Sequence, residues 1–112
     1  MFFRIFHKKK EKVEETQIIL NICKSLREIL YLQSGIKDNS TIMYNAIHYN
    51  YMATLWYDNI DKLSHKYNYF QRKRYKSFIE QSYYIINSNK SKKWKLIKAR
   101  RFLKYLYYKY KL

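Results

Sequence analysis

The chain has 112 residues, with 24 Lys and Arg against eight Asp and Glu, which gives a formal net charge of +16. Gly occurs once and Pro never, and so few turn residues argue against an all-β or α/β domain. We therefore expect one all-α domain over residues 1–112, a small bundle of three to four helices with a long second helix and a basic C-terminal helix. Because Cys23 is the only cysteine, an intrachain disulfide and a thiolate zinc site are excluded.

A first helix is predicted over residues 12–32, because apolar side chains recur there every three to four positions. Gly35 is expected to end it in the left-handed conformation. Residues 1–11 are expected to form an extended segment or one that docks on a neighbour, with a membrane-surface anchor as the alternative. The buried face of the first helix is expected to comprise Ile18, Ile19, Ile22, Cys23, Leu26, Ile29 and Leu30.

A second, longer helix is predicted to begin at a cap formed by Asn39 or Ser40. Apolar residues then alternate at spacings of four and three over residues 42–67, a seam that predicts a helix about 40 Å long. The small residues Ala46 and Ala53 in this seam let a neighbouring helix approach closely. We expect a helical hairpin with the first helix, and a coiled-coil dimer is the alternative.

An interruption is predicted at residues 67–69, followed by a third helix over residues 70–86. A basic cluster opens this helix, at the end of the helix dipole that is unfavourable for cations. It therefore predicts either an external anion or a solvated charged face. The cluster comprises Arg72, Lys73, Arg74 and Lys76. The inward-facing positions of the helix are expected to be Tyr75, Phe78, Ile79, Ser82, Tyr83, Ile85 and Ile86.

The turn over residues 87–91 is predicted to lead into a C-terminal helix that Ser91 caps. One arc of this helix is apolar and is expected to pack on the domain: Leu96, Ala99, Phe102, Leu103, Leu106, Tyr107 and Tyr110. The opposite arc mixes cations with rings: Trp94, Ile97, Lys98, Arg101, Lys104, Tyr105, Tyr108 and Lys109. One side of the helix is thus expected to pack, while the other faces a partner.

Positive charge is concentrated in the second half of the chain. Residues 1–62 carry nine basic and seven acidic side chains, whereas residues 63–112 carry fifteen basic and one acidic. Codon bias would act on both halves, so the asymmetry indicates an anionic partner. Lys and Arg neutralise phosphates, and aromatic rings stack on bases. The candidate anion-binding or nucleic-acid-binding residues are Arg72, Lys73, Arg74, Lys76, Lys92, Lys93, Trp94, Lys95, Lys98, Arg100, Arg101, Lys104, Tyr105 and Lys109.

No set of residues indicates catalysis or metal binding. His7, His48 and His65 are too dispersed in the sequence for a metal site, and Asp61 with His65 is more typical of a surface pair than of a catalytic dyad. No phosphate-binding glycine loop or zinc-protease motif occurs. We therefore expect a protein that is not an enzyme and has no cofactor and no small-molecule substrate. The chain also lacks a run of about 18 apolar residues that would predict a membrane span.

The composition indicates an AT-rich gene. Phe, Tyr, Met, Ile, Asn and Lys, whose codons are rich in A and T, make up more than half of the chain. In this respect the chain resembles short proteins encoded in ciliate mitochondrial genomes, although it shares no motif with them. The resemblance implies a subunit of the mitochondrial ribosome or of a respiratory complex, in the matrix or on the matrix side of the inner membrane. The cytoplasm of another AT-rich organism, or a viral gene, is the alternative source.

We predict a structural subunit of a large multi-subunit assembly, one that binds RNA phosphates in a ribosome-like particle. The alternative is an accessory subunit of a mitochondrial inner-membrane respiratory complex. Its basic, aromatic helices would then lie on anionic lipid or on acidic neighbouring subunits, because lipid headgroups and phosphodiesters select nearly the same side chains. A third possibility, based on the same positive charge, is a viral or phage protein that packages nucleic acid.

Overall fold

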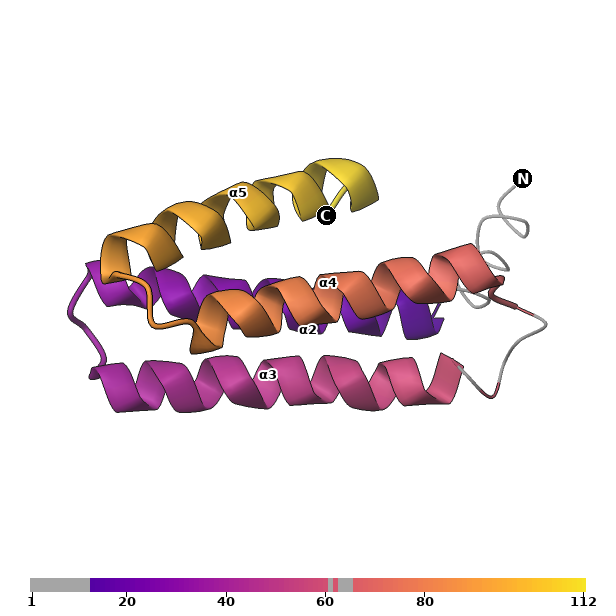
Figure 1. Cartoon of the computed structure of the whole chain (residues 1–112), viewed down its shortest axis with the longest axis horizontal. Coiled ribbons are helices and arrows are strands. Elements are labelled where there is room, and N and C mark those ends of the chain that lie inside the picture. The colour runs from indigo at the N-terminus through magenta and orange to yellow at the C-terminus, as the bar shows by residue number, and fades with distance from the viewer. Residues whose placement is uncertain (1–12, 61, 63–65) are drawn as a thin grey trace.

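Four α-helices form the part of the chain that the computed structural model describes, residues 13–60, 62 and 66–112 (Figure 1). They are α2 (Val13–Leu30), α3 (Asn39–Ile60), α4 (Tyr69–Asn87) and α5 (Lys92–Tyr110), and the short 3₁₀ helix η1 (Tyr31–Gln33) follows α2. These residues include no strand, so the predicted all-α bundle with a long second helix is confirmed. The predictions for residues 1–11 and for the pair Asp61 and His65 lie outside the described residues.

The helix α2 is at the centre of the bundle and packs on each of the other three helices. Its predicted apolar face is confirmed, since Ile18, Ile22, Leu26 and Ile29 have no exposed surface. In Figure 1, α3 and α5 lie on opposite sides of the bundle, with α2 and α4 between them. Cys23 is also fully buried on α2, and this burial raises the pKa of its thiol to about 11.

Local caps set the ends of α2 and α3. Gly35 follows η1 with a φ of +70°, the left-handed conformation expected after a helix. Asp38 caps α3, because its carboxylate accepts hydrogen bonds from the Thr41 N–H at 2.7 Å and from the Ser40 hydroxyl at 2.8 Å. These bonds hold the pKa of Asp38 below its usual value. The cap predicted at Asn39 or Ser40 is therefore wrong by one or two residues.

The helix α3 is shorter than the predicted seam. It ends at Ile60 and has 22 residues, which at 1.5 Å per residue is about 33 Å. Tyr67, predicted to continue the seam, is buried outside any helix. Asn68 and Gln71 then form a capping box, in which each side chain accepts a hydrogen bond from the backbone N–H of the other. This reciprocal cap sets the start of α4 and accounts for the predicted break at residues 67–69.

The helix α3 packs on α2 through small residues. Ala46 and Ala53 are fully buried. The hydroxyl of Ser25 on α2 donates to the backbone carbonyl of Ala46 at 2.7 Å, so the two helices approach closely at this point. The predicted hairpin of the first two helices is therefore confirmed within one chain.

The prediction that Tyr83 of α4 faces inward is wrong, because Tyr83 is 55% exposed.

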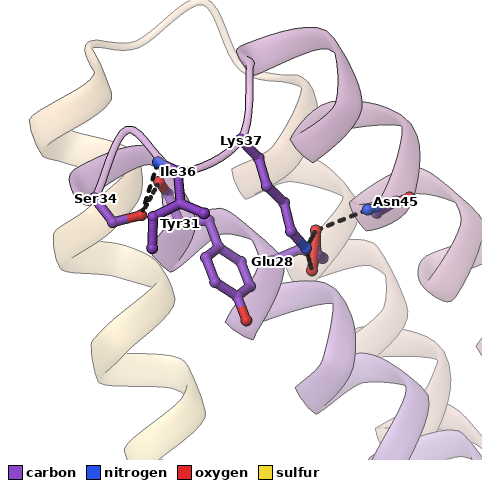
Figure 2. Close-up of polar contacts among 6 residues, drawn as sticks. All are labelled: Glu28, Tyr31, Ser34, Ile36, Lys37 and Asn45. Carbon is purple, nitrogen blue, oxygen red and sulfur yellow. Dashed lines mark hydrogen bonds and ion pairs between the residues drawn. The ribbon is translucent and has the colours of Figure 1, made fainter.

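A buried carboxylate joins the α2–α3 loop to both of its helices (Figure 2). Glu28 is 8% exposed and accepts hydrogen bonds from the Lys37 ammonium at 3.0 and 3.1 Å and from the Asn45 amide at 3.0 Å. The Lys37 ammonium also lies 4.1 Å from the centroid of the Tyr31 ring. Since a buried carboxylate is costly unless it is paired and hydrogen-bonded, these contacts hold the loop in one conformation.

Two carboxylates in the first turn of α2 accept hydrogen bonds from tyrosine hydroxyl groups. The Tyr67 hydroxyl donates to Glu14 at 2.9 Å, and the Lys66 ammonium lies 3.6 Å from the other oxygen of that carboxylate. The Tyr75 hydroxyl of α4 donates to Glu15. Both tyrosine rings are almost fully buried and meet edge to face, with centroids 6.0 Å apart. The start of α2 is thereby bound to the start of α4.

A polar contact in the core joins α3 to α4. Asn50 is 5% exposed, and its amide donates to the Ser82 hydroxyl at 2.6 Å and to the Ile79 carbonyl at 3.2 Å. The Ser82 hydroxyl in turn donates to the same carbonyl at 2.9 Å. The Asn50 amide and the Ser82 hydroxyl therefore have partners inside an apolar interface, as buried polar groups require.

Asn50→Ala is expected to lower the free energy of unfolding by about 1–3 kcal/mol, because it removes a buried amide and both of its hydrogen bonds. Asn59→Ala is the matched control, since it removes the same side chain from an exposed residue of the same helix. Urea unfolding followed by far-UV circular dichroism measures the free energy of unfolding of both variants. Equal stability of the two variants would contradict the role assigned to Asn50.

Stability is also expected to depend on the ionisation of Glu14. Burial raises the pKa of this carboxyl, but hydrogen bonds from its own backbone N–H and from Tyr67, together with the Lys66 charge, outweigh burial and lower it. A carboxyl whose pKa is lower in the folded protein stabilises the fold above its unfolded pKa. That stability is lost as the pH falls through the folded pKa.

The free energy of unfolding should therefore fall as the pH drops below the ordinary carboxyl pKa of 4.5. Tyr67→Phe removes one donor and is expected to lower stability at neutral pH by about 1.5–3 kcal/mol, and to weaken the pH dependence. Urea titrations at neutral and acidic pH measure both effects. Tyr108→Phe, at a residue that is 87% exposed, is the control and should change neither.

Candidate nucleic-acid interface

Acidic and basic side chains are separated in the structure. Glu14, Glu15 and Glu28 belong to α2 and are bonded inside the bundle. The helix α3 carries a single charged residue, Asp58. By contrast, α4 and α5 hold twelve Lys and Arg residues and only one carboxylate, Glu80. The surface that α4 and α5 form together is therefore strongly positive.

The predicted division of α5 into a packed arc and a solvent arc is confirmed. Ser91 caps the helix by accepting a hydrogen bond from the Trp94 N–H at 3.1 Å, and Lys111 ends it in the left-handed conformation. Because the packed arc is buried in the bundle, the cations of the other arc face solvent. The packed arc comprises Ala99, Phe102, Leu103 and Leu106, which are buried, and Leu96, Tyr107 and Tyr110, which are half-buried.

A groove of about 440 Å³ lies between α4 and α5. Three of the predicted contact residues, Lys98, Arg101 and Tyr105, lie in it together, and all three are exposed. The rest of the lining comes mainly from buried apolar side chains. We call this site the α4–α5 groove, and its complete lining is Phe78, Gln81, Ile85, Lys98, Arg101, Phe102 and Tyr105.

Rings and cations alternate along α5 beside this groove. The Lys98 ammonium lies 5.9 Å from the centroid of the Trp94 ring, and the Lys109 ammonium lies 5.8 Å from that of Tyr105. Each pair is four residues apart and therefore shares one face of the helix. The Trp94 ring also meets Tyr84 of α4 edge to face, with centroids 5.7 Å apart. Cations beside accessible rings suit a ligand that combines phosphates with flat bases.

Part of the basic cluster at the start of α4 lies in a second groove, between α3 and α4, with a volume of about 480 Å³. The Lys73 ammonium lies 5.8 Å from the centroid of the Tyr69 ring. The second groove also contains the carboxylate of Glu80, which offsets one of its three cations. Its lining is Tyr57, Tyr69, Arg72, Lys73, Lys76, Ser77 and Glu80.

Arg74, the remaining member of that cluster, lies near Tyr110 of α5. Burial, and next the charge of Glu15, raise the pKa of Tyr110 to about 12, while the Arg74 charge opposes this rise. Arg74 is therefore separated from the second groove, although it is adjacent in sequence to residues that line it.

Two predicted cations of α5 serve the fold. Lys95 is half-buried, and its ammonium donates to the Ile86 carbonyl at the end of α4 at 2.9 Å. Arg100 donates to the side chain of Gln33 in η1. These bonds join α5 to its neighbours, so both cations are less available to an external anion. The other predicted cations of α5 outside the groove are exposed: Lys92, Lys93, Lys104 and Lys109.

The sequence does not reveal the apolar floor of the α4–α5 groove. The helical period assigns Phe78 and Ile85 to the core, and they are indeed 5% and 6% exposed. The spacing of apolar residues along α4 cannot show that Phe78 and Ile85 also line an open groove. The groove depends on the position of α5 relative to α4, which the spacing within one helix does not give. Gln81 lies one turn from each of them and carries no sequence signal of its own.

No protein-family model, curated protein or solved structure matches the chain. Within the described residues, no group of three or more His, Cys, Asp and Glu side chains is placed to hold a metal ion. A search of the same residues finds no helix with the length and apolar character needed to cross a membrane. The interface is therefore interpreted from its own geometry and charge.

Lys95→Gln is expected to lower the free energy of unfolding by about 0.5–1.5 kcal/mol, because it removes a charged donor from a carbonyl at the C-terminal end of α4. Lys93→Gln removes the same charge from an exposed neighbour and should change stability by less than about 0.5 kcal/mol. Urea unfolding distinguishes the two. If both variants were equally stable, Lys95 would have no structural role.

Proposed function

We propose that this protein is a non-catalytic structural subunit that binds RNA phosphates in a ribosome-like particle. The observation that carries the proposal is the charge of α4 and α5, which together hold twelve Lys and Arg residues and one carboxylate, Glu80. A Lys or Arg that neutralises a phosphate releases a condensed counterion, and this release drives binding. Lys98 and Arg101 are suited to this role, because they are exposed and lie in a groove whose lining has no carboxylate.

The exposed face of α3 also supports a place in a larger assembly. The helix α3 has a single charged residue, Asp58, and exposes several apolar side chains on one face. Exposed aromatic side chains and few charges are typical of the centre of protein–protein interfaces. A subunit with one neutral and one basic side can bridge protein and RNA. The exposed apolar side chains of α3 are Tyr44, Ile47, Tyr51 and Leu55.

Two further considerations support an RNA-rich, mitochondrial setting. A net charge of +16 opposes the compact state through self-repulsion, and bound phosphates would offset this repulsion. The AT-rich composition resembles that of short proteins encoded in ciliate mitochondrial genomes, which are mostly subunits of the mitochondrial ribosome or of respiratory complexes. Attachment to anionic lipid in an inner-membrane complex is the competing function, and the experiment below distinguishes it.

RNA binding by the wild-type protein is expected to weaken steeply as the salt concentration rises. Lys98→Gln combined with Arg101→Gln should lower the slope of log affinity against log salt by about 1 to 2. Lys24→Gln combined with Lys62→Gln removes the same charge from exposed residues of α2 and of the α3–α4 connection, and should preserve most of the slope. Fluorescence anisotropy with a labelled RNA, over a series of salt concentrations, measures the RNA affinity of both double variants.

An RNA affinity that does not respond to salt would contradict phosphate binding. Equal losses in the two double variants would show that net charge alone matters, and not the α4–α5 surface. Binding to anionic phospholipid vesicles without binding to RNA would favour the membrane alternative. In native extracts we expect co-sedimentation with ribosomal particles and release by ribonuclease.

A further inference from the structure

The α4–α5 groove has an apolar floor beneath a basic rim, and phosphate binding alone does not use the floor. Phe78, Ile85 and Phe102 are 5–8% exposed and form the floor, whereas Lys98 and Arg101 are exposed at the rim. We propose that this groove receives an unpaired base of single-stranded RNA, while Lys98 and Arg101 contact the flanking phosphates. This inference rests on the RNA-binding function proposed above and names the class of RNA.

The aromatic rings of the groove pack on one another at steep angles, and Tyr105 is the one of them that is exposed. Phe78 meets Phe102 and Tyr105 at ring-centroid distances of 5.8 and 6.1 Å, with interplanar angles of 59° and 71°. The rings are therefore inclined to one another and are not stacked face to face. Tyr105 remains 46% exposed, which leaves part of its ring accessible for stacking.

A polar group in the lining favours a base over a purely apolar occupant. The Gln81 carboxamide is exposed and donates to the Ser77 hydroxyl at 3.0 Å, which leaves its carbonyl oxygen to accept a hydrogen bond. Base edges carry amino and imino groups that donate to such an acceptor. A lipid acyl chain has no group that donates to it.

The same lining distinguishes single strands from duplexes. In an RNA duplex the bases are paired and stacked, so none can enter the apolar floor without first being extruded, and only the phosphates can reach Lys98 and Arg101. In a single strand the bases turn outward at little cost, and both parts of the groove are used. The geometry therefore predicts a preference for unpaired RNA beyond the difference due to charge.

The test compares three labelled ligands with the same number of phosphates: a single-stranded RNA, an RNA duplex and an abasic strand. Fluorescence anisotropy of the full chain at one salt concentration gives each affinity. The wild-type protein is expected to bind the single strand at least several-fold more tightly than the other two. Stacking of one base predicts a loss of about 5- to 100-fold for Tyr105→Ala on the single strand, with little change on the duplex or the abasic strand.

Tyr108→Ala is the matched control, because Tyr108 is an 87%-exposed tyrosine of the same helix that does not line the groove. It removes the same side chain and no charge, and should leave all three affinities unchanged. Far-UV circular dichroism and urea unfolding establish that both variants are folded. Lys98→Gln combined with Arg101→Gln is expected to weaken binding of all three ligands, since each of them carries phosphates.

Equal affinity of the wild-type protein for all three ligands, with no effect of Tyr105→Ala, would overturn the base-binding groove but leave salt-dependent RNA binding intact. Absence of salt-dependent binding to every ligand would overturn the proposed function itself. If Tyr105→Ala weakened binding to anionic phospholipid vesicles and not to RNA, the groove would be a lipid site and the inference would be wrong. An equal loss in Tyr108→Ala would also contradict it, because that residue lies outside the groove.

Discussion

The packing of α2 against three other helices is the constraint on which the rest of the structure depends. Its apolar face forms the centre of the core, and its carboxylates are bonded to groups from the surrounding segments. Glu14 and Glu15 bind tyrosine hydroxyl groups at one end of the bundle, and Glu28 binds Lys37 and an amide at the other. Three of the eight acidic side chains of the chain are thus fixed inside the fold.

This distribution of charge bears on how α5 is held. The helix α5 packs more extensively on α2 than on α4, through an arc that contains Ala99 and Leu106. Cations line both α4 and α5, so close contact along their whole length would bring like charges together without a carboxylate between them. Attachment through α2 avoids this, and the space that remains is the α4–α5 groove. The groove and the basic surface therefore share one physical origin.

Much of the fold is readable from the sequence, because local features dominate a chain of amphipathic helices. The breaks between helices follow from short-range chemistry: Gly35 has the left-handed conformation, and Ser91 caps α5. The errors lie in the bounds of α3 and in one position of α4. The seam predicts that α3 continues to Tyr67, whereas α3 ends at Ile60 and Asn68 caps the start of α4. Tyr83 has the spacing of a core residue but lies at the edge of the buried face.

The sequence by itself determined the helices, their buried faces and the excess of positive charge in the second half, because each follows from spacing or composition along one segment. Only the tertiary structure decided which cations are available. It assigned Lys95 to the end of α4, and it placed Lys98 and Arg101, already neighbours on one arc of α5, beside Phe78 of α4. A helical period shows which side of a helix is buried. It does not show which neighbouring helix that side meets. Nor does it show where two helices separate to leave a groove, because both depend on how all four helices pack.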